Sequence, residues 1–294
     1  MEYHKPVLLN EVLENLKVEK SKKYVDATLG DGGHTLEILK RGGQVLSLEI
    51  NEEALIRAEN RVKGAGLEAN FKGALGNFKN IQALAEQHGF EHVNGVLFDL
   101  GYSSFELDDG GMGLSFLKDE PLDMRLDKSL GVTAADLVNM LPEDQLARII
   151  FGYSDERFAK KFAGAIVRSR SLKKIQTTRE LADLLKSEAS PGYEHGRIHP
   201  ATRTFQALRI AVNDEVANLE TALPRAARLL LPGGRMLVIS FHSLEDTTTK
   251  QFGRSARPSV FEITKKPITP SEEEIATNSR SRSAKLRVFE RVLK

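Results

Sequence analysis

One segment of the sequence combines glycines with acidic residues in a way that suits ligand binding by backbone groups. Residues 26–34 have the sequence DATLGDGGH and follow a short apolar run. Glycines after a strand let the backbone approach a ligand closely, and a helix that starts there points its first amides at the same place. The spacing G-x-G-G differs from the dinucleotide pattern G-x-G-x-x-G, so a cofactor without phosphates is favoured. The alternative is a plain glycine turn.

Three other candidate side chains follow strand-like runs further along the chain. Glu49 lies at the end of the run QVLSLE, where a carboxylate can accept hydrogen bonds from both ribose hydroxyls of an adenosine. Phe78 lies in a loop after a weak third strand, where its ring could pack against an adenine. Asp99 directly follows the run GVLF, and Gly101 nearby leaves space for a substrate. The alternatives are a helix cap for Glu49 and core packing for Phe78.

A parallel sheet would bring these residues together, and the first hundred residues predict one. Short apolar runs alternate with segments whose apolar residues recur at helical spacing. Strands are expected at 23–28, 44–50, 70–72 and 95–100, and helices at 34–41, 52–63 and 81–88. This alternation predicts an α/β fold with right-handed crossovers. The candidate residues would then converge on one edge of one sheet.

The pattern changes after residue 104, and we predict that residues 105–200 form an inserted helical domain. Its helices are expected at 133–140, 142–151, 155–168 and 178–187. The α/β domain would then comprise residues 1–104 and 201–294. In its second part we expect a helical stretch over 202–231 that bends near Pro224, strands at 235–240, 261–265 and 285–292, and a polar, mobile linker at 267–282.

The composition excludes several classes of function. The 294-residue chain contains no cysteine, which excludes disulfides, thiolate metal sites and cysteine nucleophiles. Its seven histidines are scattered, and no metal-binding motif of recognisable spacing is present. No apolar run approaches the roughly 20 residues that span a membrane, and the first residues do not resemble a signal peptide. We therefore expect a cytoplasmic protein that has no membrane partner and no bound metal.

Basic residues outnumber acidic ones in 157–209 and in 250–294, which fits a polyanionic partner. Arginine can pair with phosphate through two hydrogen bonds or stack on a base. The candidate side chains for binding this partner include Arg168, Arg170, Arg203 and, near the end of the chain, Arg287. Arg125 in PLDMRLD is a further substrate-binding candidate. The alternatives are solvated basic faces and, for Arg125, a structural ion pair.

Long motifs, in order along nearly the whole chain, resemble those of the bacterial 16S ribosomal RNA (cytosine N4)-methyltransferases, the small-subunit methyltransferase H family. The segments that carry the resemblance are HKPVLL at 4–9, DATLGDGGH at 26–34, FDLGYSSFELDD at 98–109, PLDMRLD at 121–127, HPATRTFQALRIAVND at 199–214, GGRMLVISFHSLED at 233–246 and SRSRSAKLR at 279–287. The resemblance implies a Rossmann-like, S-adenosylmethionine-dependent methyltransferase sheet with an inserted helical substrate-recognition domain. It also implies methyl transfer to N4 of a cytidine in the decoding region of 16S rRNA, with that RNA, within the small ribosomal subunit, as partner.

The family's cofactor-binding positions fall on Gly32, Gly33, His34, Glu49, Phe78, Asp99 and Glu106. Two of them depart from the family pattern, because Glu49 stands where aspartate is common and Glu106 where glutamine is usual. An ionised carboxylate cannot donate the hydrogen bond that an amide can. The catalytic candidates are Asp99, His242 and the backbone carbonyls of residues 100–103, any of which could accept a hydrogen from the N4 amine.

Three other functions remain as alternatives. A nucleotide-dependent oxidoreductase is disfavoured by the G-x-G-G spacing. A non-catalytic RNA-binding or ribosome-assembly factor would share the basic regions. A methyltransferase acting on DNA or protein would share the cofactor site. The sequence leaves the oligomeric state open.

Overall fold

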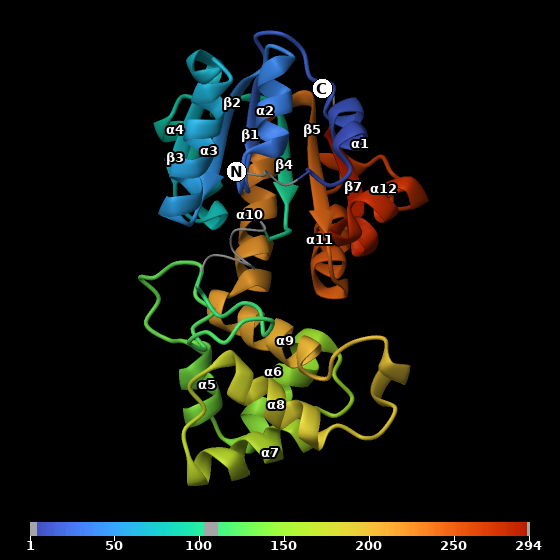
Figure 1. The fold of residues 1–294 in the computed structure, drawn as a ribbon. Coiled ribbons are helices and arrows are strands. Elements are labelled where there is room, and N and C mark those ends of the chain that lie inside the picture. The colour runs from blue at the N-terminus through green and yellow to red at the C-terminus, as the bar shows by residue number, and fades with distance from the viewer. Residues whose placement is uncertain (1–4, 103–110, 293–294) are drawn as a thin grey trace. The chain divides into compact units, whose positions relative to one another are not determined.

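The computed structural model describes residues 5–102 and 111–292. It divides the chain into two compact units (Figure 1). Met1–Ser103 and Val216–Lys294 form the first, which we call the sheet unit, and Ser104–Glu215 form the second, the helical unit. None of the described helices has the length and apolarity needed to cross a membrane.

In the described part of the chain, the sheet unit contains a seven-stranded sheet of order β3-β2-β1-β4-β5-β7-β6. Its strands are β1 (Lys23–Asp26), β2 (Gln44–Glu49), β3 (Phe71–Leu75), β4 (Val93–Asp99), β5 (Leu230–Ser240), β6 (Val260–Glu262) and β7 (Lys285–Arg291). Strands β1 to β5 run parallel, and β7 is antiparallel to both of its neighbours. The strand order reverses at the β1–β4 pair. Ligands of open parallel sheets bind beside such a reversal, at the carboxyl ends of the strands.

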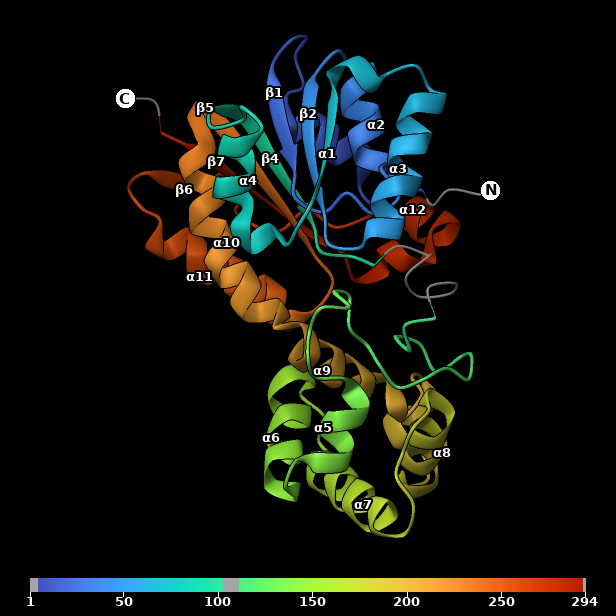
Figure 2. The same ribbon diagram turned by 90° about the vertical axis from the view of Figure 1, so that its left-hand side faces the viewer.

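Alternating side chains of the strands enter two cores on opposite faces of the sheet. Val96 and Phe98 of β4 pack with α4 and α10, whereas Leu97 between them packs with α1 and α2. Both faces are covered, which explains why the strands are continuous apolar runs. Figure 2 shows α2 and α3 on one side of the sheet and α10 and α11 on the other. The helices of this unit are α1 (Leu9–Leu16), α2 (Gly33–Lys40), α3 (Glu52–Gly64), α4 (Ile81–Gln87), α10 (Glu215–Leu229), α11 (Ser243–Ser255) and α12 (Glu272–Thr277).

The helical unit has an apolar core of its own. Its helices are α5 (Ala134–Met140), α6 (Glu143–Ser154), α7 (Ala159–Leu172), α8 (Thr178–Glu188) and α9 (Ala201–Asn213). Thr177 caps α8 by accepting a hydrogen bond from the amide of Glu180, whose side chain bonds back to the cap residue. Glu156 is fully buried, and the hydroxyl of Tyr193 donates a hydrogen bond to it. That bond offsets part of the cost of removing a carboxyl group from water.

The predicted α/β fold class is confirmed, and the strands and helices expected in the first hundred residues are all present. Four features differ from the expectation. The helical unit extends to Glu215 and includes α9, whereas the expected boundary lies at residue 200. Helix α1 is not among the predicted helices. The helical stretch over 202–231 breaks at Asp214, which has a left-handed φ of 49°, while α10 continues through Pro224. Residues 267–282 are not a featureless mobile linker, because they contain α12, where Glu274 accepts a hydrogen bond from the amide of Leu8 at 2.7 Å.

Gly113 provides a test of the packing of the helical unit. Its φ is 67°, and a Cβ there would lie 2.2 Å from the carbonyl oxygen of Pro121. We expect Gly113→Ala to lower the free energy of unfolding of this unit by about 2 kcal/mol or more, through backbone strain and the clash. Gly131→Ala is the matched control, because a Cβ at Gly131 has no neighbour within 4 Å. Urea unfolding of both variants would measure the difference, and equal midpoints would contradict the clash.

Candidate cofactor site

The predicted cofactor-binding residues of the sheet unit lie at the carboxyl edge of its parallel strands. Gly32 precedes α2, whose first two residues are Gly33 and His34. Glu49 is the last residue of β2, and Asp99 is the last residue of β4. Because parallel strands end at the same edge, the structure gathers these residues around one region, as the sequence predicts.

Steric limits explain the glycines of the turn before α2. Gly32 has a φ of 73°, which L side chains rarely adopt, and a Cβ there would lie 3.3 Å from the Cβ of Ala58. A Cβ at Gly33 would lie 2.8 Å from Cγ of Pro6. The amide of Gly30 donates a hydrogen bond to Oε2 of Glu49 at 2.9 Å, which ties the turn to the end of β2.

Glu49 is positioned by backbone amides on both sides. Oε2 accepts the bond from Gly30, and Oε1 accepts one from the amide of Asn51 at 2.9 Å. A carboxylate offers about four acceptor positions, so backbone amides and ribose hydroxyls can share it. The cap of α3 is the side chain of Asn51, which accepts from the amides of Glu53 and Ala54. A helix-capping role therefore does not account for Glu49.

His34 and Asp99 face each other between α2 and β4. Nε2 of His34 lies 3.4 Å from Oδ2 of Asp99, without the geometry of a hydrogen bond. Neither ring nitrogen of His34 has a hydrogen-bond partner among the described residues, although only 6% of the side chain is exposed. Buried polar atoms normally have partners, so these two nitrogens are available for contact with a ligand. The side chain of Asp99 stays 20% exposed at the same edge.

A buried set of polar groups centred on Asp26 lies behind this pair. Oδ2 of Asp26 accepts a hydrogen bond from the hydroxyl of Thr35 at 2.7 Å, and Oδ1 accepts one from the amide of Thr28 at 3.2 Å. The hydroxyl of Thr28 in turn accepts a bond from the amide of Asp99 at 2.7 Å. Since His34 precedes Thr35 and faces Asp99, the contacts close into a ring. We call this set the Asp26 ring: Asp26, Thr28, Asp99, His34 and Thr35.

The environment of Asp26 changes its acidity. Burial raises the pKa of Asp26 to about 6, and the bond from Thr35 and the nearby His34 oppose only part of this rise. The hydroxyl oxygens of Thr35 and Ser47 lie 2.8 Å apart, which extends the set to β2. Asp26, Thr35 and Ser47 are not among the predicted site residues. The signal for Asp26 and Ser47 is a polar residue at the end of or within an apolar run, as in KYVD and QVLSLE.

The loop residues of the predicted site are less clearly assigned. Phe78 is partly buried against the core, and its ring lies 5.9 Å from the ring of Phe98 and nearly perpendicular to it. Core packing therefore occupies Phe78, and contact with an adenine stays a prediction. Gly101 does not leave open space, because a Cβ there would lie 2.9 Å from the ring of Phe241. Glu106 lies outside the described residues.

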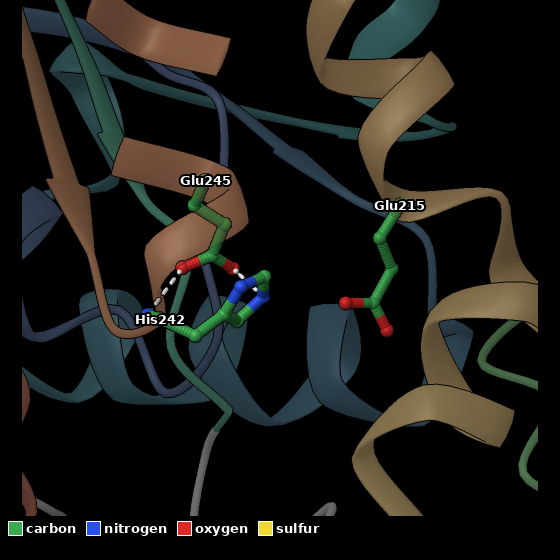
Figure 3. Close-up of side chains that lie close together, drawn as sticks. All are labelled: Glu215, His242 and Glu245. Atoms are coloured by element: carbon green, nitrogen blue, oxygen red, sulfur yellow. Dashed lines mark hydrogen bonds and ion pairs between the residues drawn. The ribbon is translucent and has the colours of Figure 1, made fainter. Parts of the chain in front are cut away.

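His242 follows β5 and precedes α11 (Figure 3). Its Nε2 lies 3.0 Å from Oε1 of Glu245, again without hydrogen-bond geometry. Oε2 of Glu245 accepts hydrogen bonds from the amides of Phe241 and His242 at 2.7 and 3.2 Å. Glu245 thus fixes the first turn of α11 beside the imidazole. Proton acceptance by His242 stays a prediction.

Two predicted RNA-binding arginines of the helical unit are held by carboxylates. Arg125 donates to both oxygens of Asp123, at 2.6 and 2.8 Å, and to the carbonyl of Leu130 at 2.6 Å. The bond from Arg125 lowers the pKa of Asp123, as expected for a stable ion pair. Arg203 donates to Glu194 at 2.6 Å. Their contact with RNA stays a prediction.

The other two arginines of this group lie on α7. Arg170 donates to the carbonyl of Val138 at 2.7 Å. The side chain of Arg168 is 66% exposed, with a single 3.3 Å contact to Glu188, so it is the best placed of the four to meet a polyanion. In the sheet unit, the expectation for Arg287 is wrong. Arg287 is buried, bonded to Asp246 at 2.6 Å and to Glu262 at 2.5 Å.

Comparison with known proteins identifies the family of this chain. The model of the MraW methylase family matches residues 1–292. "Ribosomal RNA small subunit methyltransferase H" of Carboxydothermus hydrogenoformans is 46% identical, with 98% of each chain covered. The protein of the same name from Deinococcus deserti is 47% identical, with 99% of this chain and 94% of the relative covered. The one from Persephonella marina is 43% identical over 98% of this chain and 99% of the relative. The chain therefore belongs to the MraW methylase family.

Proposed function

We propose that this protein transfers a methyl group from S-adenosylmethionine to N4 of a cytidine in the decoding region of 16S rRNA, in the cytoplasm. The observation that carries the proposal is the convergence of Glu49, the glycine turn and the His34–Asp99 pair on one sheet edge. Membership of a methylase family supports the reaction class. The relatives' names support small-subunit ribosomal RNA as the substrate class.

The chemistry of the residues at this edge fits that donor. The carboxylate of Glu49 can accept hydrogen bonds from the two ribose hydroxyls. The amides at the start of α2 suit a carboxylate group, because an N-terminal helix end favours negative charge. Asp99 supplies a negative charge for the cationic part, and the unpartnered nitrogens of His34 supply polar contacts. When bound, the donor supplies an electrophilic methyl group.

The protein's own task is alignment and removal of a proton. The N4 amine of cytosine is a weak nucleophile, because its lone pair is delocalised into the ring. Holding the amine in line with the methyl group is therefore the main contribution expected of the enzyme. An acceptor for one N4 hydrogen would localise the lone pair and receive the proton. Asp99, His242 and the carbonyls that follow Asp99 are the groups proposed for this role.

Access to the base requires it to leave its stack, and the RNA must be held while it does so. The basic surface of α7 supports such a contact. Arg168 is exposed on that helix, and Lys160 and Lys161 near its start are exposed as well. Phosphate binding by such side chains weakens with salt, because counterions are released from the RNA.

Asp99→Asn separates the possible roles of Asp99. It keeps the size of the side chain and removes the negative charge. We expect the methyl transfer rate at saturating substrate to fall by about 100-fold if Asp99 accepts the proton. A fall in donor affinity at an unchanged saturated rate would instead assign Asp99 to cofactor binding. His242→Asn, measured by the same assay and by calorimetry of donor binding, is the comparison. Full rate and affinity in Asp99→Asn would remove Asp99 from the mechanism.

Arg168→Glu tests the RNA surface. We expect about tenfold weaker binding to 16S rRNA at low salt, and a salt dependence whose slope is smaller by about 1. Arg148→Glu on α6 is closely matched, because Arg148 is also an exposed arginine, paired with Asp144 at 2.7 Å. It should change the slope much less. Equal effects of the two substitutions in a salt titration would show only a general charge effect.

The target is tested by mass spectrometry of 16S rRNA from cells that lack this protein. We expect one cytidine of the decoding region to lack its N4 methyl group. Expression of the parent chain should restore the group, and the Asp99→Asn variant should restore it poorly. An unchanged methylation pattern in the deletion strain would reject 16S rRNA as the substrate.

A further inference from the structure

The Asp26 ring places a buried carboxylate directly behind the groups that face the cofactor. Asp26 lies at the end of β1, in the strand pair where the sheet order reverses, and only 1% of it is exposed. Its two oxygens hold Thr28 and Thr35, and these residues lead to Asp99 and His34. Asp26 is therefore connected to Asp99 through Thr28 and to the neighbour of His34 through Thr35.

The direction of the hydrogen bonds in this network, that is, which group donates, depends on whether Asp26 carries a proton. When Asp26 is ionised it can only accept, so Thr35 donates to it and Ser47 must donate to Thr35. When Asp26 is protonated it can donate to Thr35, and the direction of both bonds can reverse. The titratable groups that face Asp26 are His34 on α2 and Asp99 on β4. A charge at Asp26 acts over a long range, because the protein interior screens it weakly.

We propose that Asp26 is a specificity-determining residue, whose buried charge makes the site prefer the cationic methyl donor over its uncharged-sulfur product. This rests on the proposed function. The sulfonium of the donor carries one positive charge that the thioether of the product lacks, while the rest of the two molecules is the same. A negative charge behind the His34–Asp99 pair lowers the free energy of the bound donor more than that of the product. Product release after each methyl transfer is eased by the same difference.

The proposal has a consequence for pH. Because the pKa of Asp26 is about 6, its charge is present above that pH and lost below it. The ratio of donor affinity to product affinity should rise as the pH increases from 5 to 7.5. Titration of the amino and carboxyl groups common to donor and product largely cancels in this ratio. His34 and Asp99 also face the site. Variants are therefore needed to isolate the contribution of Asp26 to the pH dependence of the affinity ratio.

The experiment measures the binding of S-adenosylmethionine and S-adenosylhomocysteine by calorimetry from pH 5 to 7.5. Asp26→Asn keeps the shape of the side chain and removes the charge. We expect the affinity ratio at pH 7.5 to fall by about fivefold, the order expected of one buried charge, and its rise with pH to be much smaller. Partial unfolding alone would lower the affinity for both ligands equally and leave the ratio of the two affinities unchanged.

Two threonine variants complete the test. Thr35→Val removes a bond that stabilises the ionised form of Asp26, so the rise of the ratio should move to higher pH. Thr249→Val is the matched control, because Thr249 is fully buried in the same unit and its hydroxyl has no partner among the described residues. It should behave like the parent chain.

The possible outcomes separate the two proposals. A parent chain that binds neither ligand overturns the proposed function and this inference together. A parent chain that binds the donor with a ratio independent of pH overturns the inference alone, as does an Asp26→Asn variant with the parent's profile. If Asp26→Asn does not fold, the profiles of the parent and Thr35→Val still decide the question.

Discussion

A carboxyl group that is removed from water needs hydrogen-bond donors, and Asp26 finds them in segments that must be aligned for a ligand to bind. Thr35 belongs to the first helix after the glycine turn, and Thr28 leads to the end of β4. The same bonds that make the burial of Asp26 tolerable therefore align β1, β4 and α2. The position of Asp99 opposite His34 follows from this arrangement.

Much of the sheet unit could be predicted because its signals are local. The strands are continuous apolar runs, since helices cover both faces, and Glu49 and Asp99 stand at the ends of such runs. Glycine spacing marked the turn before α2. The Asp26 ring could not be predicted, because which polar side chains meet depends on the register of β1 against β4 and on the rotation of α2. Those are properties of the assembled sheet.

Other differences between sequence and structure also have a tertiary origin. Asp214 breaks the long helical stretch in a left-handed conformation that the sequence does not mark with a glycine. Arg287 lies in a basic region of the sequence, yet the fold buries it between Asp246 and Glu262. Basic regions of a sequence show how many basic side chains are present. Only the fold shows which of these side chains form ion pairs with carboxylates of the same chain.

Residues 274–278 support the segment that packs beside the glycine turn. Pro6 occupies the space beside Gly33. Residues on either side of Pro6 form hydrogen bonds with residues far along the chain: Glu274 accepts one from the amide of Leu8, and Asn278 donates one to the carbonyl of Lys5. Contacts so distant in sequence carry a large loop-closure cost, which slows folding. During biosynthesis the N-terminal strands leave the ribosome long before residues 274–278 exist. The nascent polypeptide can therefore complete this side of the glycine turn only after residues 274–278 have been synthesised.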